Sequence, residues 1–546
     1  MTELGLPRWV AGRRAVASTP WDRDELGTVR QVYCALVIVA AAAQLMFFWS
    51  IEDNAASTLL ALASSLIGIT HALDGRRFRA LPVSALILLL YTTTATSGAL
   101  LVKTLEWSAL ADRLTVPVTT FAVLLGTQLA LIGADLLYQR ALPLQNFRGW
   151  LTRRALMPLG VMRWPSDAQL WLLGLIGCAS VLIGGTDFES ATSFGLASAG
   201  GKIIKAFGFL KYAPFLIPFR DALGGVPRHP RLPLLALVLY FAALVGISFA
   251  TNSRSTFADA VPTIGICVLS ALALGRIDVK RIPPAQLIVF VLVAVLASIV
   301  LSRVALAMVV ARDYRYGADA ATVVRTTIEA LFNSEWLAAA KAKMDTSVAV
   351  GNYSEEYVDS RFFARFLLTK FHDNVLYYFS LMGPDQIASY KGFMLDRLAA
   401  TLPDPALRLL GLSIDKQDLI FSNGDYLVYI VDGWGLGSFK TGSMVAEVFG
   451  VFGWAWPLVM ITSGIVLFVF YDALAMPTAE GRLAMSPLII LLIWNLCGTT
   501  AAFGLGAETV TAIFGGIVRT LPQNVLVYAL AVWAVKQAMR LWGRAT

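Results

Sequence analysis

Long apolar stretches of about 20 residues, almost free of charge, constrain this chain more than any other feature of its sequence. Hydrophobic residues make up 57% of the chain and charged residues only 15%, whereas a typical soluble domain is about half apolar and about a quarter charged. Because lipid cannot satisfy bare backbone groups, such stretches must be helices or a closed barrel. Continuous apolar runs fit helices better than alternating strands. The sequence therefore predicts an all-α, polytopic membrane protein.

About a dozen transmembrane helices are expected from these stretches. They fall at residues 31–50, 56–73, 80–102, 115–138, 169–184, 202–219, 232–250, 257–275, 285–306, 446–471, 487–504 and 525–541. Two regions leave the count open. The fifth stretch is short, and residues 507–522 could form a re-entrant or interfacial segment instead of a plain loop.

Positive charge accumulates in every second connection between these helices. The residues concerned are Arg76, Arg77, Arg79, Arg140, Arg148, Arg153, Arg154, Arg163, Arg220, Arg228, Arg231, Arg276, Lys280 and Arg281. By the positive-inside rule these connections face the cytoplasm. This orientation also accounts for the formal net charge of +8 without a nucleic-acid partner. The expected organisation is a cytoplasmic tail at 1–30, nine helices in 31–310, a large extracytoplasmic loop at 311–445, three helices in 446–541 and a cytoplasmic tail at 542–546.

The large loop is the segment in which function is expected, because a long insertion in a compact protein is usually functional. Residues 320–343 and 357–381 lack Gly and Pro and have apolar residues at helical spacing, so both are predicted to be helices. Gly383-Pro384 is expected to end the second of them.

The densest polar cluster of the loop lies on this second predicted helix. Arg361, Arg365 and His372 are spaced so that two guanidinium groups and an imidazole would share one helical face. Paired guanidinium groups match phosphate oxygens and keep their charge at physiological pH. The face could therefore bind a phosphate or pyrophosphate, or its charges could simply meet lipid headgroups or internal acidic partners.

Four further cations are expected at the same membrane level. Lys202 and Lys205 open the sixth helix, Arg254 stands on a short turn between two helices, and Lys440 precedes the tenth helix. Positive residues are disfavoured on this side, so they are candidates for the anion site. Lysine and arginine at helix ends can also snorkel to the interface without any ligand.

Glu447 is the acidic residue best placed for chemistry, because it lies where the loop returns to the membrane among apolar neighbours. It could act as a base or form a structural ion pair. Asp135 and Asp259 lie within predicted helices and are interpreted as structural partners of cations. The four cysteines lack ligand spacing, and the sequence has no Walker loop and no HExxH motif, so we predict neither a metal nor a cofactor.

Three local patterns resemble those of Wzy-type O-antigen or exopolysaccharide repeat-unit polymerases, a GT-C-like group of membrane glycosyltransferases. The first is Asn252-Ser-Arg-Ser-Thr-Phe at the start of a helix, and the second is the Arg-rich segment containing Arg361 and Arg365. The third is Gly442-Ser443 followed by Glu447 and by Phe-Gly pairs ending at Trp454. Here the two Phe-Gly pairs are separated by one residue, Val451, which departs from the family pattern.

The resemblance implies polymerisation of undecaprenyl-pyrophosphate-linked repeat units at the periplasmic face of the bacterial inner membrane. Its donor and acceptor would both be lipid-linked glycans, and a chain-length regulator and a flippase would be partners. On this reading Arg361, Arg365 and Arg254 hold the pyrophosphate, with Lys202, Lys205 and Lys440 assisting, and Glu447 or His372 is the base. Two alternatives stay open: an O-antigen ligase, and a lipid-linked glycan flippase or other secondary transporter.

Overall fold

The computed structural model describes residues 25–184, 199–225, 234–274, 284–312, 320–347, 353–402, 404–419, 421–438, 440–477, 483–498 and 504–545. Within these ranges, eight helices are long and apolar enough to cross a membrane. They are Leu26–Phe47, Asn54–Ala72, Pro82–Leu105, Pro117–Arg140, Leu234–Thr251, Ser255–Ala273, Met444–Asp472 and Thr511–Leu541. The protein is therefore an α-helical, multi-pass membrane protein.

The first part of the chain forms most of the bundle. Its elements are α1 (Glu25–Phe47), α2 (Asn54–Ala72), α3 (Gly75–Ala80), α4 (Pro82–Thr92), the π-helix η1 (Thr93–Ser97), α5 (Gly98–Leu105), α6 (Pro117–Arg140), α7 (Leu142–Leu151), the π-helix η2 (Thr152–Leu156), α8 (Asp167–Ile183), α10 (Ala199–Lys205), the 3-10 helix η3 (Gly208–Phe219), α11 (Leu234–Thr251), α12 (Ser255–Ala258), α13 (Ala260–Ala273) and α14 (Pro284–Arg312).

The large loop and the C-terminal part supply the remaining elements. In the loop they are α15 (Ala320–Phe332), α16 (Ser334–Ser347), the 3-10 helix η5 (Phe363–Phe366), α17 (Thr369–Leu381), α18 (Pro384–Ala400), α19 (Asp404–Leu409), the 3-10 helix η6 (Lys416–Leu419) and α20 (Asn423–Asp432). After it come α21 (Met444–Phe452), the 3-10 helix η7 (Gly453–Ala455), α22 (Trp456–Asp472), the antiparallel pair β1 (Ala475–Pro477) and β2 (Leu483–Met485), α23 (Pro487–Leu492), α24 (Trp494–Cys497), α25 (Thr511–Gly515), the π-helix η8 (Gly516–Thr520) and α26 (Leu521–Ala545).

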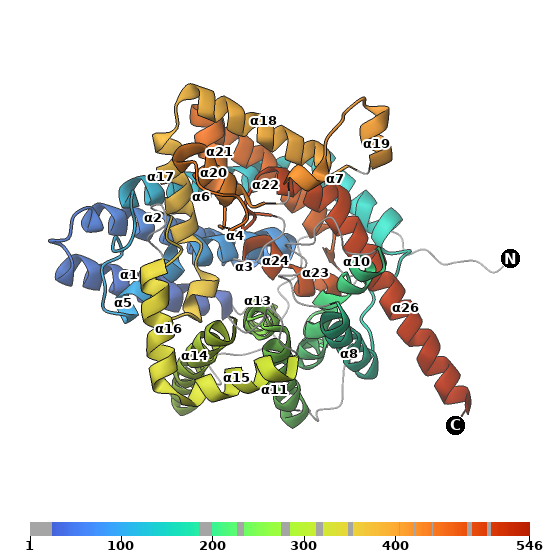
Figure 1. The fold of residues 1–546 in the computed structure, drawn as a ribbon. Helices are drawn as coiled ribbons and strands as arrows, with labels where there is room; N and C mark the ends of the chain where they lie inside the picture. Colours follow the sequence, from blue (N-terminus) through green and yellow to red (C-terminus); the bar gives the residue numbers. More distant parts are fainter. Residues whose placement is uncertain are drawn as a thin grey trace.

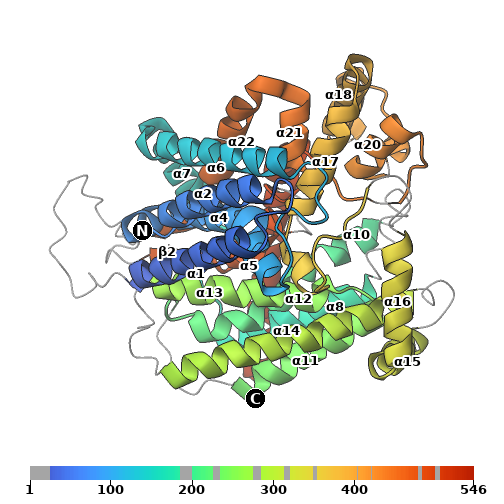
Figure 2. The same cartoon turned by 90° about the vertical axis from the view of Figure 1, so that its left-hand side faces the viewer.

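The bundle helices run side by side, and the loop helices gather at one end of them. Figure 2 shows α1, α2, α6, α13, α14 and α11 lengthwise, with α16 and α18 lying across their ends. In Figure 1, which looks nearly along the bundle, α18 and α16 are seen lengthwise. The loop lies at the end opposite to the start of α1 (Figure 2). The helix α26 also lies lengthwise in Figure 1, so it crosses the bundle direction at a steep angle.

The second helix shows why the bundle can pack closely. The buried face of α2 consists mainly of Ser, Thr, Ala, Gly and Asn, whereas Leu59 on its outer face is 55% exposed. Apolar side chains face lipid at no cost, and small or hydroxyl-bearing residues let helices approach and hydrogen-bond. Gly68 illustrates this, because a side chain there would overlap Thr92 of α4.

Two of the expected transmembrane helices differ from the structure, and the region left open proves to be helical in part. The sixth, 202–219, is a short α10 followed by the 3-10 helix η3, whose Pro214 and Pro218 cannot donate to an α-helical ladder. The eleventh, 487–504, divides into α23 and α24, and α24 ends at Cys497. In the region left open at 507–522, residues from Thr511 onward continue directly into α26. The described residues thus support a multi-pass protein without establishing twelve spans.

Of the two helical regions predicted within the large loop, the first is confirmed and the second is wrong in its first half. Residues 320–343 are helical, as α15 and α16. The predicted helix 357–381 begins only at Thr369, because Leu367 is extended and the N–H of Leu368 donates to the carbonyl of Thr94 at 2.8 Å. Arg361 and Arg365 therefore do not share a helical face with His372. The helix ends at Leu381, next to Gly383, as expected.

The two acids in the predicted bundle helices, buried Asp135 and half-buried Asp259, have different partners. Asp135 pairs with Arg77 and lies 3.5 Å from the His71 imidazole, so its interpretation as a partner of cations is confirmed. Asp259 accepts a hydrogen bond of 3.1 Å from the indole N–H of Trp494. This bond connects the start of α13 to α24.

Candidate active site

The π-helix η1 anchors the loop helix that carries His372. Its Thr94 and Ala95 carbonyls point outward and accept hydrogen bonds of 2.8 Å from Leu368 N–H and from the Thr369 hydroxyl. A π-turn contains one more residue than an α-helical turn, which redirects carbonyl groups from the helical ladder, and such turns are frequent at functional sites. The start of α17 is therefore fixed against the bundle.

His372, one turn into α17, meets the start of α21. Its Nδ1 lies 2.6 Å from the Ser443 hydroxyl, which also accepts the N–H of Ala446 as the N-terminal cap of α21. Burial lowers the pKa of His372 to about 3, so the ring is neutral at physiological pH. The buried Nε2 has no hydrogen-bond partner among the described residues.

Glu447 lies one turn further along α21 and is fully buried. Its Oε1 accepts hydrogen bonds from the Tyr390 hydroxyl at 2.9 Å and the Asn423 amide at 3.0 Å. Its Oε2 accepts the Val510 N–H at 2.7 Å. The carboxylate thus joins α18, α20, α21 and the segment before α25, an arrangement that suits a structural role better than proton abstraction from a ligand.

Arg397 approaches this network from α18 but does not contact Glu447 in any described hydrogen bond. One of its guanidinium nitrogens donates to Asn423 Oδ1 at 2.5 Å and to the carbonyl of Phe421 at 2.9 Å. The amide of Asn423 therefore lies between the guanidinium and the carboxylate. Neutral donors thus hold Glu447 in place of the ion pair that was one of the two alternatives for this residue.

Glu508 is an acidic residue of the same region that the sequence analysis missed. It precedes α25, is only partly buried, and its Oε2 accepts the N–H of Asn423 at 3.1 Å. Desolvation by the surrounding protein raises its pKa to about 7. Its only sequence signal was its position in the segment 507–522 that could be re-entrant.

The predicted phosphate-binding arginines lie in two segments that pack against each other. Arg254 immediately precedes α12, and Phe257 and Ala258 of α12 share one apolar cluster with Phe362, the neighbour of Arg361. The Phe366 ring that follows Arg365 lies 5.6 Å from the Trp494 ring, which in turn bonds to Asp259. Arg254, Arg361 and Arg365 are thus brought to one region. We call it the arginine region.

The backbone around Arg254 is held in an unusual turn. Asn252 has a φ of +46°, a left-handed conformation that asparagine tolerates better than most residues. The Tyr212 hydroxyl reaches the carbonyls of Ser255 and Thr256 at 3.0 and 3.2 Å. These contacts fix the direction in which the chain enters α12.

The irregular segment 353–361 carries Arg361 and is held to the bundle by ionic groups. Buried Lys103 donates to Asp112 at 3.1 Å and to the Tyr357 carbonyl at 3.2 Å. Arg113 pairs with Asp359 at 2.8 Å, and Arg361 itself pairs with Glu356. Lys103 lies at the end of a predicted membrane helix, so sequence analysis had no reason to select it.

The predicted lysines make other contacts. The alkyl chain of Lys205 lies against Gly184 at the end of α8. Lys440 places its ammonium group 5.5 Å from the centre of the Tyr353 ring, and its main-chain N–H donates to Asp425 at 3.0 Å. The backbone of Lys202 lies in α10, and its side chain is outside the described part of the structure. No described contact joins these lysines to the arginine region.

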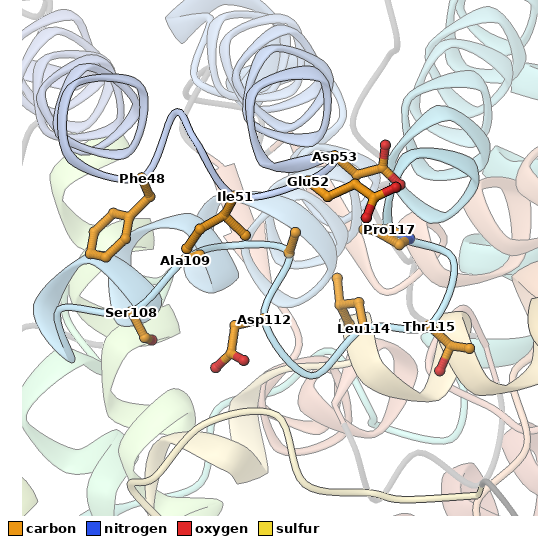
Figure 3. A pocket seen from close by; sticks show the side chains of 11 residues that line it. Phe48, Ile51, Glu52, Asp53, Ser108, Ala109, Asp112, Leu114, Thr115 and Pro117 are labelled. Carbon is orange, nitrogen blue, oxygen red and sulfur yellow. The ribbon is translucent and has the colours of Figure 1, made fainter.

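A separate depression lies between the α1–α2 turn and the loop before α6. Figure 3 shows the carboxylates of Glu52 and Asp53 on one rim and that of Asp112 on another, with Phe48 and Ile51 between the two chain segments. The acidic lining is unsuited to a phosphate. Among the described residues, no three His, Cys, Asp or Glu side chains converge as metal ligands do.

Comparison of the chain with models of protein families, with curated proteins and with solved structures finds no match. The functional argument therefore depends on the residues themselves and on the sequence patterns that first selected them.

Proposed function

We propose that this protein polymerises undecaprenyl-pyrophosphate-linked oligosaccharide repeat units at the periplasmic face of the bacterial inner membrane. One observation carries the proposal. Arg254 and the pair Arg361 and Arg365, selected from segments about 100 residues apart, occur where α12 and η5 pack together. Such a concentration of cations at the loop end of a membrane bundle suits a lipid-linked pyrophosphate.

The reaction requires stabilisation of a leaving group more than it requires covalent catalysis. A hydroxyl of one lipid-linked glycan attacks the anomeric carbon of another, and the bond to the pyrophosphate breaks. Fixed guanidinium groups can stabilise the charge that develops on the pyrophosphate oxygens. Arg361, which now pairs with Glu356, would exchange this carboxylate for the phosphate when the donor binds.

The remaining parts of the proposal concern location and partners. The loop lies at the end of the bundle opposite to the start of α1, which agrees with a cytoplasmic N-terminus and a periplasmic loop by the positive-inside rule. Both lipid-linked substrates would enter from the outer leaflet, where a flippase delivers them. A chain-length regulator would act on the growing polymer.

The transporter alternative requires charged or broken segments near the middle of the bundle. In the eight candidate spans, each charged side chain lies within six residues of a helix end, except Arg519, which lies eight residues from the start of the last span. The broken segments α10–η3 and α23–α24 carry no acidic side chain. This distribution favours chemistry at the surface of the membrane over a binding site at its midplane. The ligase alternative uses the same donor, and it is separated from a polymerase by its product.

The test is electrophoresis of surface glycan from a strain that lacks the gene, complemented with wild type, Arg361→Ala or Arg325→Ala. Arg325 is a matched control, because it is an exposed arginine of the same loop that pairs only with Glu329 in the described structure. We expect a polymer ladder with wild type and Arg325→Ala, and single repeat units without the gene or with folded Arg361→Ala. Complete loss of attached glycan would indicate a ligase, and an unchanged ladder would reject polymerisation.

A further inference from the structure

The polymerase reaction needs a base for the acceptor hydroxyl, and neither residue selected from the sequence suits that role. Both oxygens of Glu447 are engaged by internal donors, and the side chain is fully buried. The depressed pKa of His372 makes its ring a weak proton acceptor at neutral pH. A carboxylate that is accessible and less fully bonded is required.

Glu508 meets these two requirements. It is partly exposed, and the only hydrogen bond that the described structure gives it is the one from Asn423 to Oε2. Among the described residues no donor reaches its Oε1, so this oxygen can accept a hydrogen bond from a ligand. Gly442 faces it so closely that a side chain there would lie 3.0 Å from the Glu508 Cβ and main-chain oxygen. Glycine at 442 therefore allows the chain before α21 to pack closely against Glu508 and Asn423.

We infer that Glu508 is the general base of the proposed transfer, an inference that rests on the proposed function. Its carboxylate takes the proton of the acceptor hydroxyl while the hydroxyl oxygen bonds to the anomeric carbon of the donor. The bond from that carbon to the pyrophosphate breaks, and its electron pair leaves with the pyrophosphate. Glu447 then acts as a positioning residue, because it holds Asn423, whose N–H orients Glu508.

The charges around Glu508 support a proton acceptor that works near neutral pH. Desolvation, together with the like charges of Glu355 and Asp425, raises its pKa, whereas the N–H of Asn423 and the charge of Arg397 lower it. The result is a pKa of about 7. A base with this value is half ionised at neutral pH and still able to hold a proton in the transition state.

One segment of the loop, residues 353–361, runs from the neighbourhood of Glu508 to the arginine region. Lys440 lies over the Tyr353 ring, and the Tyr353 hydroxyl donates to Thr441, next to Gly442. The segment 353–361 leads from Tyr353 to Arg361. Even a fully extended chain of eight residues spans no more than about 29 Å, which is the upper limit of the distance between these two residues. Lys440 is thus the cation on the Glu508 side of the site, and the arginine region lies at the other end of this segment.

The test uses full-length protein in proteoliposomes, with lipid-linked repeat units extracted from the strain that carries the gene. Transfer rates between pH 5.5 and 8.5 are compared for wild type, Glu508→Gln, Glu508→Asp and the exposed control Glu329→Gln. We expect the wild-type rate to rise with pH through about 7, because Glu508 accepts a proton only when ionised. Glu508→Gln should lose about 100-fold or more in rate together with this pH dependence, while it still retains the lipid-linked donor. Glu329→Gln should behave as wild type.

Two outcomes would overturn the inference in distinguishable ways. If wild type forms polymer and folded Glu508→Gln forms it at a similar rate and with the same pH profile, Glu508 is not the base but the polymerase proposal stands. If wild type forms no polymer, the proposed function fails and the inference fails with it. Should Glu508→Gln not fold, Glu508→Asp decides, since a base at this position predicts a displaced pH profile and a structural residue does not.

Discussion

The imidazole Nδ1 of His372 and the hydroxyl of Ser443 lie 2.6 Å apart, although 71 positions separate them in the chain. The contact joins the first turn of α17 to the first residue before α21, where the large loop returns to the bundle. Because Ser443 also caps α21, one hydroxyl both starts a membrane helix and holds a loop helix against it.

Removing this hydroxyl should destabilise the fold. Ser443→Ala loses the cap, which costs about 0.5–2 kcal/mol, and it also leaves His372 Nδ1 buried without its partner. We expect a lower apparent melting temperature in detergent than for wild type, measured by intrinsic fluorescence. Ser443→Thr, which keeps the hydroxyl, and Ser380→Ala, at an exposed position of α17, should change it little. Equal melting of Ser443→Ala and wild type would contradict the role of the contact.

His372 should make the protein sensitive to acid. Burial lowers its pKa from 6.5 to about 3. Between these two pH values the imidazole is protonated in the unfolded chain and neutral in the folded protein. Stability from this group is complete above pH 6.5 and falls as the pH approaches 3, by up to about 1.4 kcal/mol per pH unit. His372→Gln should lose less stability than wild type between pH 7 and pH 5. Parallel losses in the two proteins would show that His372 is not the responsible group.

We expect that Glu447 is required for folding rather than for the transfer reaction. Glu447→Ala leaves donors from Tyr390, Asn423 and Val510 without their acceptor in a buried site, at about 1–3 kcal/mol for each group. The expected result is a lower yield of folded protein in size-exclusion chromatography. Glu329→Ala, at an exposed position of α15, is the control. A fully folded Glu447→Ala protein that makes no polymer would instead assign the residue to the reaction.

The Phe449-Gly450 pair of α21 has a packing explanation. A Cβ at Gly450 would overlap the ring of Phe379 on α17, and small-to-large changes in a packed interior cost about 1–3 kcal/mol. Gly450→Ala should therefore separate α17 from α21 and lower the melting temperature. Gly265→Ala on α13 meets no atom within 4 Å and should be tolerated. Tolerance of both substitutions would show that α17 does not depend on this close approach.

Sequence patterns were sufficient where one physical property dominates. Apolar length predicts membrane helices because lipid leaves the backbone no other partner, and the absence of Gly and Pro with helical spacing predicted α15 and α16. The Gly383-Pro384 pair predicted the end of α17, because glycine and proline interrupt a helix locally. Arg254, Arg361 and Arg365 were selected for the permanent charge of the guanidinium group, and their role stays a prediction.

Tertiary structure decided what local patterns could not. Leu368 leaves the expected helix because its N–H finds a carbonyl of η1, more than 270 residues earlier in the chain, and this contact separates the arginines from the face of His372. Lys103 and Glu508 acquire importance only through partners that are distant in sequence. Membrane insertion is encoded in the apolar length of each segment, whereas the candidate site depends on hydrogen bonds and ion pairs between segments, which exist only after the bundle has assembled.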